Sequence, residues 1–186
     1  MKKQIINYIP IILIGVLAVF GCQKSIEQYY HEGSNQFNSG DFKGAIESYS
    51  KYIEKGNNEK LKNAAIEYRA LSYFALKEVD IALKELNGLI DKLPKSDVDL
   101  WNYYYCRSYI LSDIKKYPEA IADINIALEY NMPKQFREMS IGYRALYKYK
   151  SGDFIGAKVD SFILKKNYNG YQKNFNDFIK TLQSEN

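Results

Sequence analysis

The sequence predicts an all-α protein: an α-solenoid of about four helix pairs, followed by a C-terminal capping helix and preceded by a signal peptide. A small residue recurs at spacings of 37, 38 and 37 residues, at Ala45, Ala82, Ala120 and Ala157. Two fragments also repeat almost literally: Ser39 to Phe42 returns as Ser151 to Phe154, and Ile66 to Leu71 returns as Ile141 to Leu146. One helix pair cannot bury its own apolar face, so equal units of this kind must stack on one another.

The N-terminal segment has the layout of a secretory signal. Lys2 and Lys3 give a basic start, an apolar run extends from Ile5 to Phe20, and Gly21 follows it. The run is shorter than the ~20 apolar residues that a membrane-spanning helix needs. We therefore expect residues 1–21 to be a signal peptide that is removed on export.

A lipid anchor is expected at the end of this signal. The four residues from Val19 to Cys22 resemble the bacterial lipobox, in which a cysteine after a small residue is lipidated and becomes the new N-terminus. Residues 22–25 would then form a short tether, and two or more acyl chains would hold the protein stably on a membrane. The alternative is an uncleaved anchor helix in which Cys22 has no role.

Apolar residues at helical spacing predict a helical domain over residues 26–186. Ser25 is suited to cap the first helix, and Pro118 fits the first turn of the sixth, where its missing N–H costs nothing. Eight helices are expected near 26–38, 42–55, 60–77, 79–92, 97–114, 117–130, 134–150 and 154–166. A further amphipathic pattern over 168–183 predicts the capping helix, with apolar residues at Tyr171, Phe175, Phe178, Ile179 and Leu182.

The repeated unit resembles the tetratricopeptide repeat (TPR), which places small and aromatic residues at fixed positions of a helix-turn-helix. In the third copy the residues that fit this pattern are Tyr104, Tyr117, Ala120, Ile121, Ala127 and Leu128, and the fit is weakest in the fourth copy. The four copies are expected at about 26–59, 63–96, 101–134 and 138–167. Their spacing exceeds the 34 residues of the family by three or four. We place the extra residues in the turns between repeats, near 56–58, 94–97 and 131–133.

Three arginines each precede an acidic residue by 16 positions: Arg69 and Glu85, Arg107 and Asp123, Arg144 and Asp160. In a helical hairpin such positions can face each other, so that a planar guanidinium grips a carboxylate. Copy one lacks both partners and has Glu32 and Ser48 instead. We interpret the three pairs as internal ion pairs, because charges at packing positions need a partner. The alternative is that the arginines bind an acidic ligand.

The resemblance also implies a binding surface. In the family, the first helix of each pair lines a concave groove, and its inward positions here carry mostly aromatic and amide side chains. Tyrosine suits peptide recognition because it combines apolar area with a hydroxyl and few rotors. The alternative is that these aromatic residues only pack between repeats. The groove residues expected on this basis are Tyr30, Phe37, Asn38, Glu67, Phe74, Asn102, Tyr105, Tyr109 and Tyr149.

No catalytic, metal or cofactor site is expected. His31 is the single histidine and has no companion nucleophile in a recognisable motif. Cys106 is interpreted as a small buried side chain rather than a reactive thiolate. Two cysteines and one histidine do not make a structural zinc site. The net charge of +4 comes with interspersed lysines and glutamates, so no nucleic-acid partner is expected.

The sequence therefore favours a bacterial TPR lipoprotein, exported and anchored in the envelope, with the outer membrane favoured over the inner. It would be an adaptor that binds a partner protein or peptide in its concave groove, with envelope assembly or secretion as the expected setting. One alternative is a structural protein that self-associates on the membrane, and another is an accessory subunit of an envelope enzyme complex.

Overall fold

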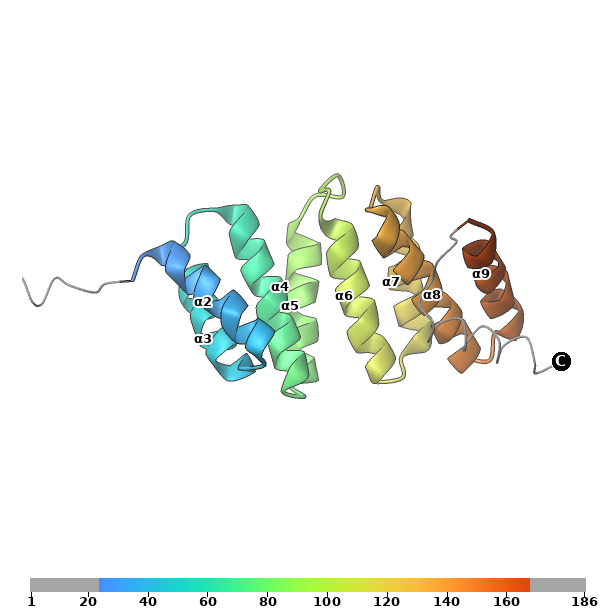
Figure 1. Cartoon of the computed structure of the whole chain (residues 1–186), viewed down its shortest axis with the longest axis horizontal. Coiled ribbons are helices and arrows are strands. Elements are labelled where there is room, and N and C mark those ends of the chain that lie inside the picture. Colours follow the sequence, from blue (N-terminus) through green and yellow to red (C-terminus); the bar gives the residue numbers. More distant parts are fainter. Residues whose placement is uncertain (1–23, 168–186) are drawn as a thin grey trace, which may run out of the picture.

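A computed structural model describes residues 24–167 and confirms the predicted all-α class, with helices and no strand in that range (Figure 1). The expected signal peptide, the lipidation site Cys22 and the capping helix at 168–183 lie outside the described residues. The helices are α2 (Ile26–Ser39), α3 (Phe42–Lys55), α4 (Glu59–Ala75), α5 (Val79–Lys92), α6 (Leu100–Asp113), α7 (Tyr117–Glu129), α8 (Lys134–Lys150) and α9 (Phe154–Asn167).

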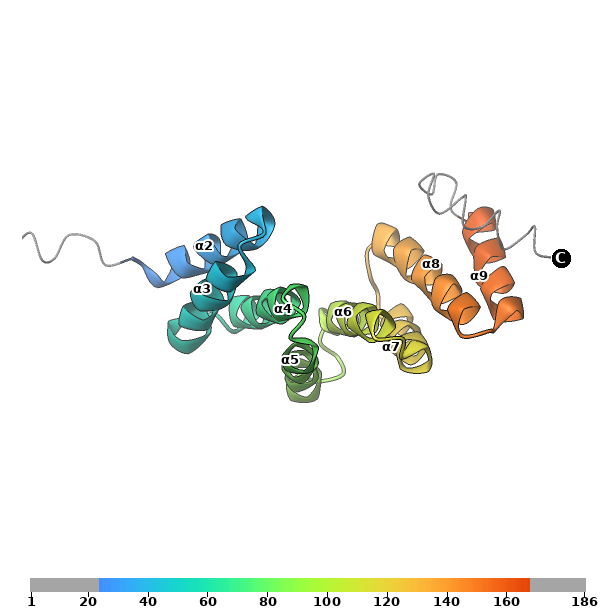
Figure 2. The ribbon, with the colours of Figure 1, turned by 90° about the horizontal axis from the view of Figure 1, so that it is seen from below.

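The helices form four consecutive pairs that stack into an arc, and each helix packs mainly on its neighbours in the sequence. In Figure 2, α2, α4, α6 and α8 line the inner side of this arc, and α3, α5 and α7 lie outside it. The first helix of each pair therefore faces the concave side. The connections between pairs are irregular segments of the chain, and the one before α6 is longer than expected because α6 begins at Leu100 rather than near residue 97.

The repeated Ser-Gly-Asp-Phe fragment is a helix stop followed by a helix start. Gly40 and Gly152 have φ values of 82° and 89°, a left-handed conformation that costs glycine nothing. Asp41 then accepts a hydrogen bond from the backbone N–H of Gly44 at 3.0 Å, and Asp153 accepts one from Gly156 at 2.8 Å. Each aspartate thereby caps an otherwise unpaired donor at the start of the next helix.

The same turn occurs in the two middle repeats without glycine. Lys77 and Lys115 have φ values of 67° and 62°, and they follow Gly40 at the repeat spacing. A residue with a Cβ in this conformation carries a cost of roughly 1–2 kcal/mol. The geometry of the hairpin is therefore kept in all four repeats, although the residue best suited to it stands in only two.

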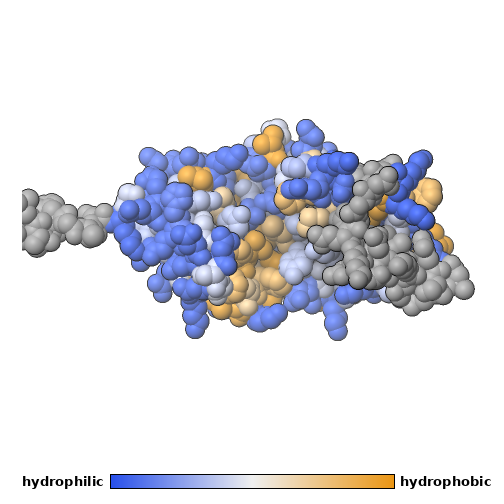
Figure 3. Space-filling view, viewed as in Figure 1, coloured by the Kyte–Doolittle hydropathy of each residue, from blue (hydrophilic) through white to orange (hydrophobic). Residues whose placement is uncertain are grey.

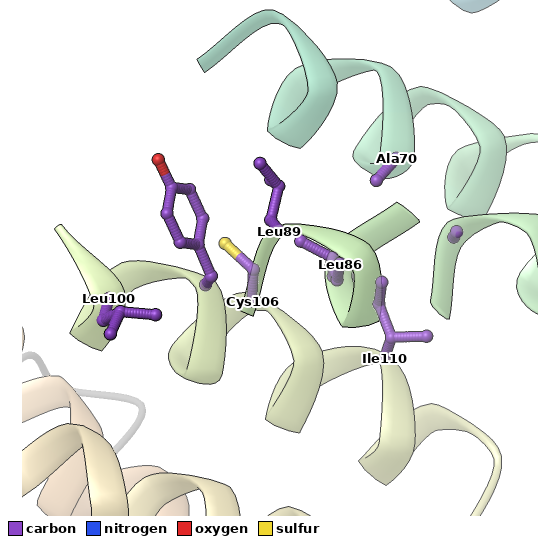
Figure 4. Packing of buried hydrophobic residues seen from close by; sticks show 8 residues of the cluster. Ala70, Leu86, Leu89, Leu100, Cys106 and Ile110 are labelled. Atoms are coloured by element: carbon purple, nitrogen blue, oxygen red, sulfur yellow. The ribbon is translucent and has the colours of Figure 1, made fainter. Parts of the chain in front are cut away.

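The core is divided into clusters that join neighbouring repeats. The recurring small residues Ala45, Ala82, Ala120 and Ala157 are all 0% exposed, because each lies where two helices cross closely. Between them, larger apolar side chains from successive pairs interdigitate. Figure 4 shows the cluster that links the second and third pairs, in which α4, α5 and α6 contribute Ala70, Leu86, Leu89, Leu100, Cys106 and Ile110.

In the first repeat, a tyrosine occupies the space beside a glycine. Gly33 in α2 is buried, and a Cβ added to it would lie 2.9 Å from two ring atoms of Tyr49 in α3. Tyr49 is 0% exposed and packs edge-on against Tyr30 and in a stack with Tyr68 of the next repeat. Its hydroxyl lies 3.2 Å from the Ser34 hydroxyl, and burial raises the pKa of Tyr49 to about 12.

Gly33→Ala should lower the free energy of unfolding by about 1–3 kcal/mol, because the new methyl group overlaps the Tyr49 ring. Gly88→Ala is the matched control: Gly88 is exposed inside α5 and nothing lies within 4 Å of its added Cβ. It should raise stability by about 0.5–1 kcal/mol through helix propensity. Urea unfolding followed by circular dichroism measures both, and equal effects of the two variants would contradict this account of the first repeat.

Candidate functional site

Aromatic side chains form a continuous band along the concave side, from α4 through α6 to α8. We call it the aromatic band and define it as Phe74, Trp101, Tyr105, Tyr109, Phe136 and Tyr143. Its ring centroids are 5.7 Å apart for Phe74 and Tyr109, 6.2 Å for Tyr109 and Tyr143, and 5.0 Å for Trp101 and Phe136. Tyr105 connects the Trp101–Phe136 pair to Tyr143, since its ring centroid lies 6.3 Å from that of Phe136 and 6.0 Å from that of Tyr143. These rings fill the space between α6 and α8.

Part of the aromatic band is open to solvent. Tyr109 is 46% exposed and Phe74 is half-buried beside it. Figure 3 shows the concave face, with an apolar patch between α4 and α6. Leu71 of α4 is half-buried and packs against the cluster between the second and third pairs. An exposed aromatic ring on a contiguous apolar surface is typical of a binding site.

The other expected groove residues have different roles. Tyr30 packs against Tyr49 and Tyr52 at 5.9 and 5.4 Å, and Phe37 packs against Phe42 and Tyr68. Tyr149 packs against Phe154 at 5.3 Å, within the fourth pair. Packing against neighbouring rings therefore explains why Tyr30, Phe37 and Tyr149 are aromatic. Asn38 is exposed at the end of α2, whereas Glu67 and Asn102 bind each other.

The aromatic band includes three residues that the sequence analysis did not select: Trp101, Phe136 and Tyr143. Trp101, Tyr105 and Tyr109 recur every four positions in α6, which places them on one side of the helix. That spacing could have identified Trp101. The rings from α8 could not have been found in this way, because their contacts depend on how α8 lies against α6.

Glu67 is the centre of a buried polar cluster between α4 and α6. It is 8% exposed, and its Oε1 accepts hydrogen bonds from the side-chain amide of Asn102 at 2.7 Å and from the thiol of Cys106 at 3.5 Å. Burial raises the pKa of Glu67, although the two hydrogen bonds oppose this shift. Burial and the nearby carboxylate also raise the pKa of Cys106, so its thiol stays protonated and unreactive near neutral pH.

The three arginines lie beside the acids that the spacing indicates. Arg107 binds Asp123 through two nitrogens, with Nε–Oδ2 at 2.8 Å and Nη2–Oδ1 at 2.7 Å. Arg144 does the same with Asp160 at 2.9 and 2.6 Å. Arg69 grips Glu85 at 3.1 and 2.6 Å. Because the acids are at most 15% exposed and already held by both oxygens, the arrangement explains these arginines without an acidic ligand.

Each arginine also reaches the preceding repeat, which the sequence analysis missed. The Nη1 atoms of the three donate to side-chain oxygens of the preceding second helix at 2.9, 2.7 and 2.8 Å. The acceptors are Ser50, Asn87 and Asn125, which follow one another at 37 and 38 residues. That repeated spacing of short polar residues is the signal from which the contact could have been inferred.

The first repeat replaces the arginine pair with smaller polar contacts. Glu32, which stands where the others have arginine, binds Lys24 at 2.7 Å, and Ser48 donates to the side-chain oxygen of Gln36 at 2.8 Å. No repeat precedes it in the described chain, so an arginine here would have no second helix to reach.

His31 and the acidic residues between positions 24 and 167 do not assemble into a metal-binding cluster. His31 is exposed and lies edge-on to Tyr30 at 6.0 Å. Over residues 24–167, histidine, cysteine, aspartate and glutamate side chains nowhere gather in groups of three or more that could hold a metal ion. The same stretch contains no helix whose length and apolar content would let it span a lipid bilayer.

Comparison with solved structures shows the fold. A tetratricopeptide repeat protein from Parabacteroides merdae matches with a TM-score of 0.65 and 15% identity, over 85% of this chain and 60% of its own. This chain thus spans less than two thirds of that protein. TPR-like repeats described as those of a kinesin light chain from Podosopora anserina match with a TM-score of 0.65, 12% identity and coverage of 85% and 90%.

The MamA protein matches with a TM-score of 0.59 and 16% identity, over 85% of this chain and 86% of its own. No protein-family model and no curated protein matches the sequence. At these identities the likeness establishes the architecture, which is that of stacked tetratricopeptide repeats.

Arg107→Ala should lower the free energy of unfolding by about 3–5 kcal/mol, because Asp123 would be left buried without its partner. Arg107→Met with Asp123→Leu should recover part of this loss, since no unpaired charge remains. Lys92→Ala, which removes an exposed pair with Glu59, should change stability very little. Chemical unfolding of the variants tests this, and a negligible effect of Arg107→Ala would show that the pair does not stabilise its helical hairpin.

Proposed function

We propose that this chain, whose fold is that of stacked tetratricopeptide repeats, is a lipid-anchored adaptor of the bacterial envelope that binds a partner protein or peptide on its concave face. The observation that carries the binding role is the half-exposed ring of Tyr109, set in the aromatic band beside Phe74. An aromatic anchor on a concave apolar surface is the typical centre of a protein-binding site.

The construction of the concave face favours tight binding of an extended segment. Rings in the aromatic band contact one another across α4, α6 and α8, and the arginine contacts join successive pairs. A surface whose side chains are already fixed loses little conformational entropy when a ligand arrives. Binding energy then comes from burying the open part of the band rather than from ordering it.

The membrane anchor in this proposal rests on the sequence from Lys2 to Cys22: a basic start, an apolar run and a cysteine after a small residue. The tether from Cys22 to Ser25 is short, and α2 begins at Ile26. A lipid on Cys22 would therefore hold the first repeat close to the bilayer surface. An outer-membrane location is favoured over an inner-membrane one.

Tyr109→Ala should weaken binding of the native partner by about tenfold or more, because the exposed ring is the anchor that the partner buries. The measurement is crosslinking of the tagged protein in host membranes, followed by quantitative mass spectrometry of what it captures. Ile81→Ala is the matched control: Ile81 is 41% exposed but lies on α5, in the outer layer.

The outcomes separate the proposal from its alternatives. Loss of one defined protein with Tyr109→Ala but not with Ile81→Ala supports the adaptor role. Capture of only further copies of this chain would instead identify a self-associating structural protein. Capture that is identical for wild type and Tyr109→Ala would place the interaction away from the concave face, as expected for an accessory subunit docked by another surface.

Cys22→Ala should abolish lipidation and shift the protein from the membrane fraction to the soluble fraction. Metabolic labelling with an alkyne fatty acid, followed by fractionation, measures both effects. Cys106→Ala is the control because Cys106 is buried and should not be labelled. Equal labelling of wild type and Cys22→Ala would reject the anchor while leaving the adaptor role intact.

A further inference from the structure

We infer that the concave face carries a subsite for a cationic side chain, lysine or arginine, of the bound peptide, with Glu67 as its acceptor and Asn63 beside it. This inference rests on the adaptor role proposed above and adds the chemistry of the partner. It begins from the contrast between Glu67 and the other buried acids. Glu85, Asp123 and Asp160 each bind an arginine, whereas Glu67 meets no cation among the described residues.

The carboxylate of Glu67 has one oxygen occupied and one available. Both of its hydrogen bonds, from Asn102 and Cys106, fall on Oε1. Its Oε2 makes none within residues 24–167, yet it is not among the fully buried atoms that lack a partner there. It follows that Oε2 keeps some contact with solvent. Asn102 and Cys106 fix the carboxylate in place, and Oε2 can accept a hydrogen bond from an incoming group.

Asn63 supplies an independent sign of a missing donor. Its side-chain Oδ1 is buried and has no hydrogen-bond partner in the described chain, and the residue is 8% exposed. Asn63 lies one turn before Glu67 on the same face of α4, and helical side chains lean toward the N-terminus, so Glu67 leans over that turn. A buried acceptor without a partner costs about 1–3 kcal/mol. An ammonium or guanidinium that reaches Glu67 brings several donors to this turn of α4.

The surroundings favour a positive rather than a neutral donor. Asp99 lies close enough for its charge to contribute to the raised pKa of Glu67, and its own partner Lys60 is an exposed residue at 3.3 Å. Burial raises the pKa of Tyr30, Tyr68 and Tyr103, and the charge of Glu67 adds to each shift, so phenol rings of three helices lie near this carboxylate. Carboxylates and tyrosine faces together stabilise a cation, the latter through the ring quadrupole.

The position of Glu67 also sets a spacing for the ligand. Phe74 of the aromatic band lies seven residues after Glu67 on α4, about 10 Å along the helix. An extended peptide advances about 3.3 Å per residue. A segment that runs along α4 would therefore place its basic residue about three positions from the apolar residue that covers Phe74 and Tyr109.

The test is selection from a phage-displayed random peptide library on the full chain in mild detergent, followed by affinity measurement with synthetic peptides. The selected peptides should share a lysine or arginine about three positions from an apolar residue. Replacing that basic residue with norleucine should weaken binding to the wild-type protein by about tenfold or more. This comparison needs no protein variant, so misfolding cannot obscure it.

Glu67→Gln keeps an acceptor for Asn102 but removes the charge, and it should weaken the basic peptide about tenfold while leaving the norleucine peptide unchanged. Glu47→Gln is the matched control, because it removes one exposed carboxylate from α3 in the outer layer. Circular dichroism checks that both variants fold.

Two failures are distinguishable. Selected peptides without a basic residue, or equal affinity of the norleucine peptide, overturn the cation subsite while leaving the adaptor role standing if Tyr109→Ala still weakens them. If no peptide is enriched, or if binding ignores both Glu67→Gln and Tyr109→Ala, the cation subsite and the peptide-binding groove are both rejected.

Discussion

The solenoid depends on one repeated interaction, the arginine that binds an acid of its own repeat and a polar oxygen of the repeat before it. A helix pair with only apolar contacts could slide or rotate on its neighbour at little cost, because hydrophobic burial is not directional. The guanidinium removes this freedom. Its planar fork takes a carboxylate on one side, as in Arg107 with Asp123, and its remaining nitrogen reaches Asn87 on the preceding pair. One side chain thus closes its own hairpin and fixes the position of that hairpin on the preceding one.

The concave face combines packing and recognition in the same residue type. Between α6 and α8, contacts between rings of the aromatic band replace a close contact between the two helices. Their first role is therefore to set the spacing between these helices. The same rings leave part of their surface uncovered at Tyr109. A tyrosine can serve both purposes because its ring packs while its hydroxyl tolerates water. This explains why the chain carries 18 tyrosines and yet shows only one of its described tyrosines among the strongly exposed large apolar residues.

Glu67 belongs neither to the arginine contacts nor to the aromatic band. Fragment Ile66 to Leu71 and its copy Ile141 to Leu146 differ at a single position, where Glu67 is replaced by Gly142. Repeats that are otherwise alike therefore differ at an inward position of the first helix. Structural positions of a solenoid recur because every repeat must solve the same packing problem. A buried acid that occurs in one repeat, with its carboxylate held by Asn102 and Cys106, has no such general role.

The sequence by itself determined the repeat, most of its helix ends and its internal ion pairs, because these depend on residues close in the chain or at a fixed spacing. Gly40 followed by Asp41 encodes the end of one helix and the start of the next. The 16-residue interval between arginine and acid is the separation of facing positions in one helical hairpin. Ser25 likewise caps α2 through a reciprocal pair of hydrogen bonds with Gln28.

Only the tertiary structure decided which inward aromatic residues are packed and which are open. Tyr30 and Tyr109 are both tyrosines expected in the groove, yet Tyr30 is enclosed by Tyr49 and Tyr52, and Tyr109 remains 46% exposed. Tyr49 and Tyr52 of the same helix pair cover Tyr30, whereas Tyr109 contacts rings of the two neighbouring pairs, Phe74 and Tyr143, and keeps part of its own ring open. Whether an inward ring is covered depends on contacts between distant residues, and a local pattern cannot specify these because many packings satisfy it.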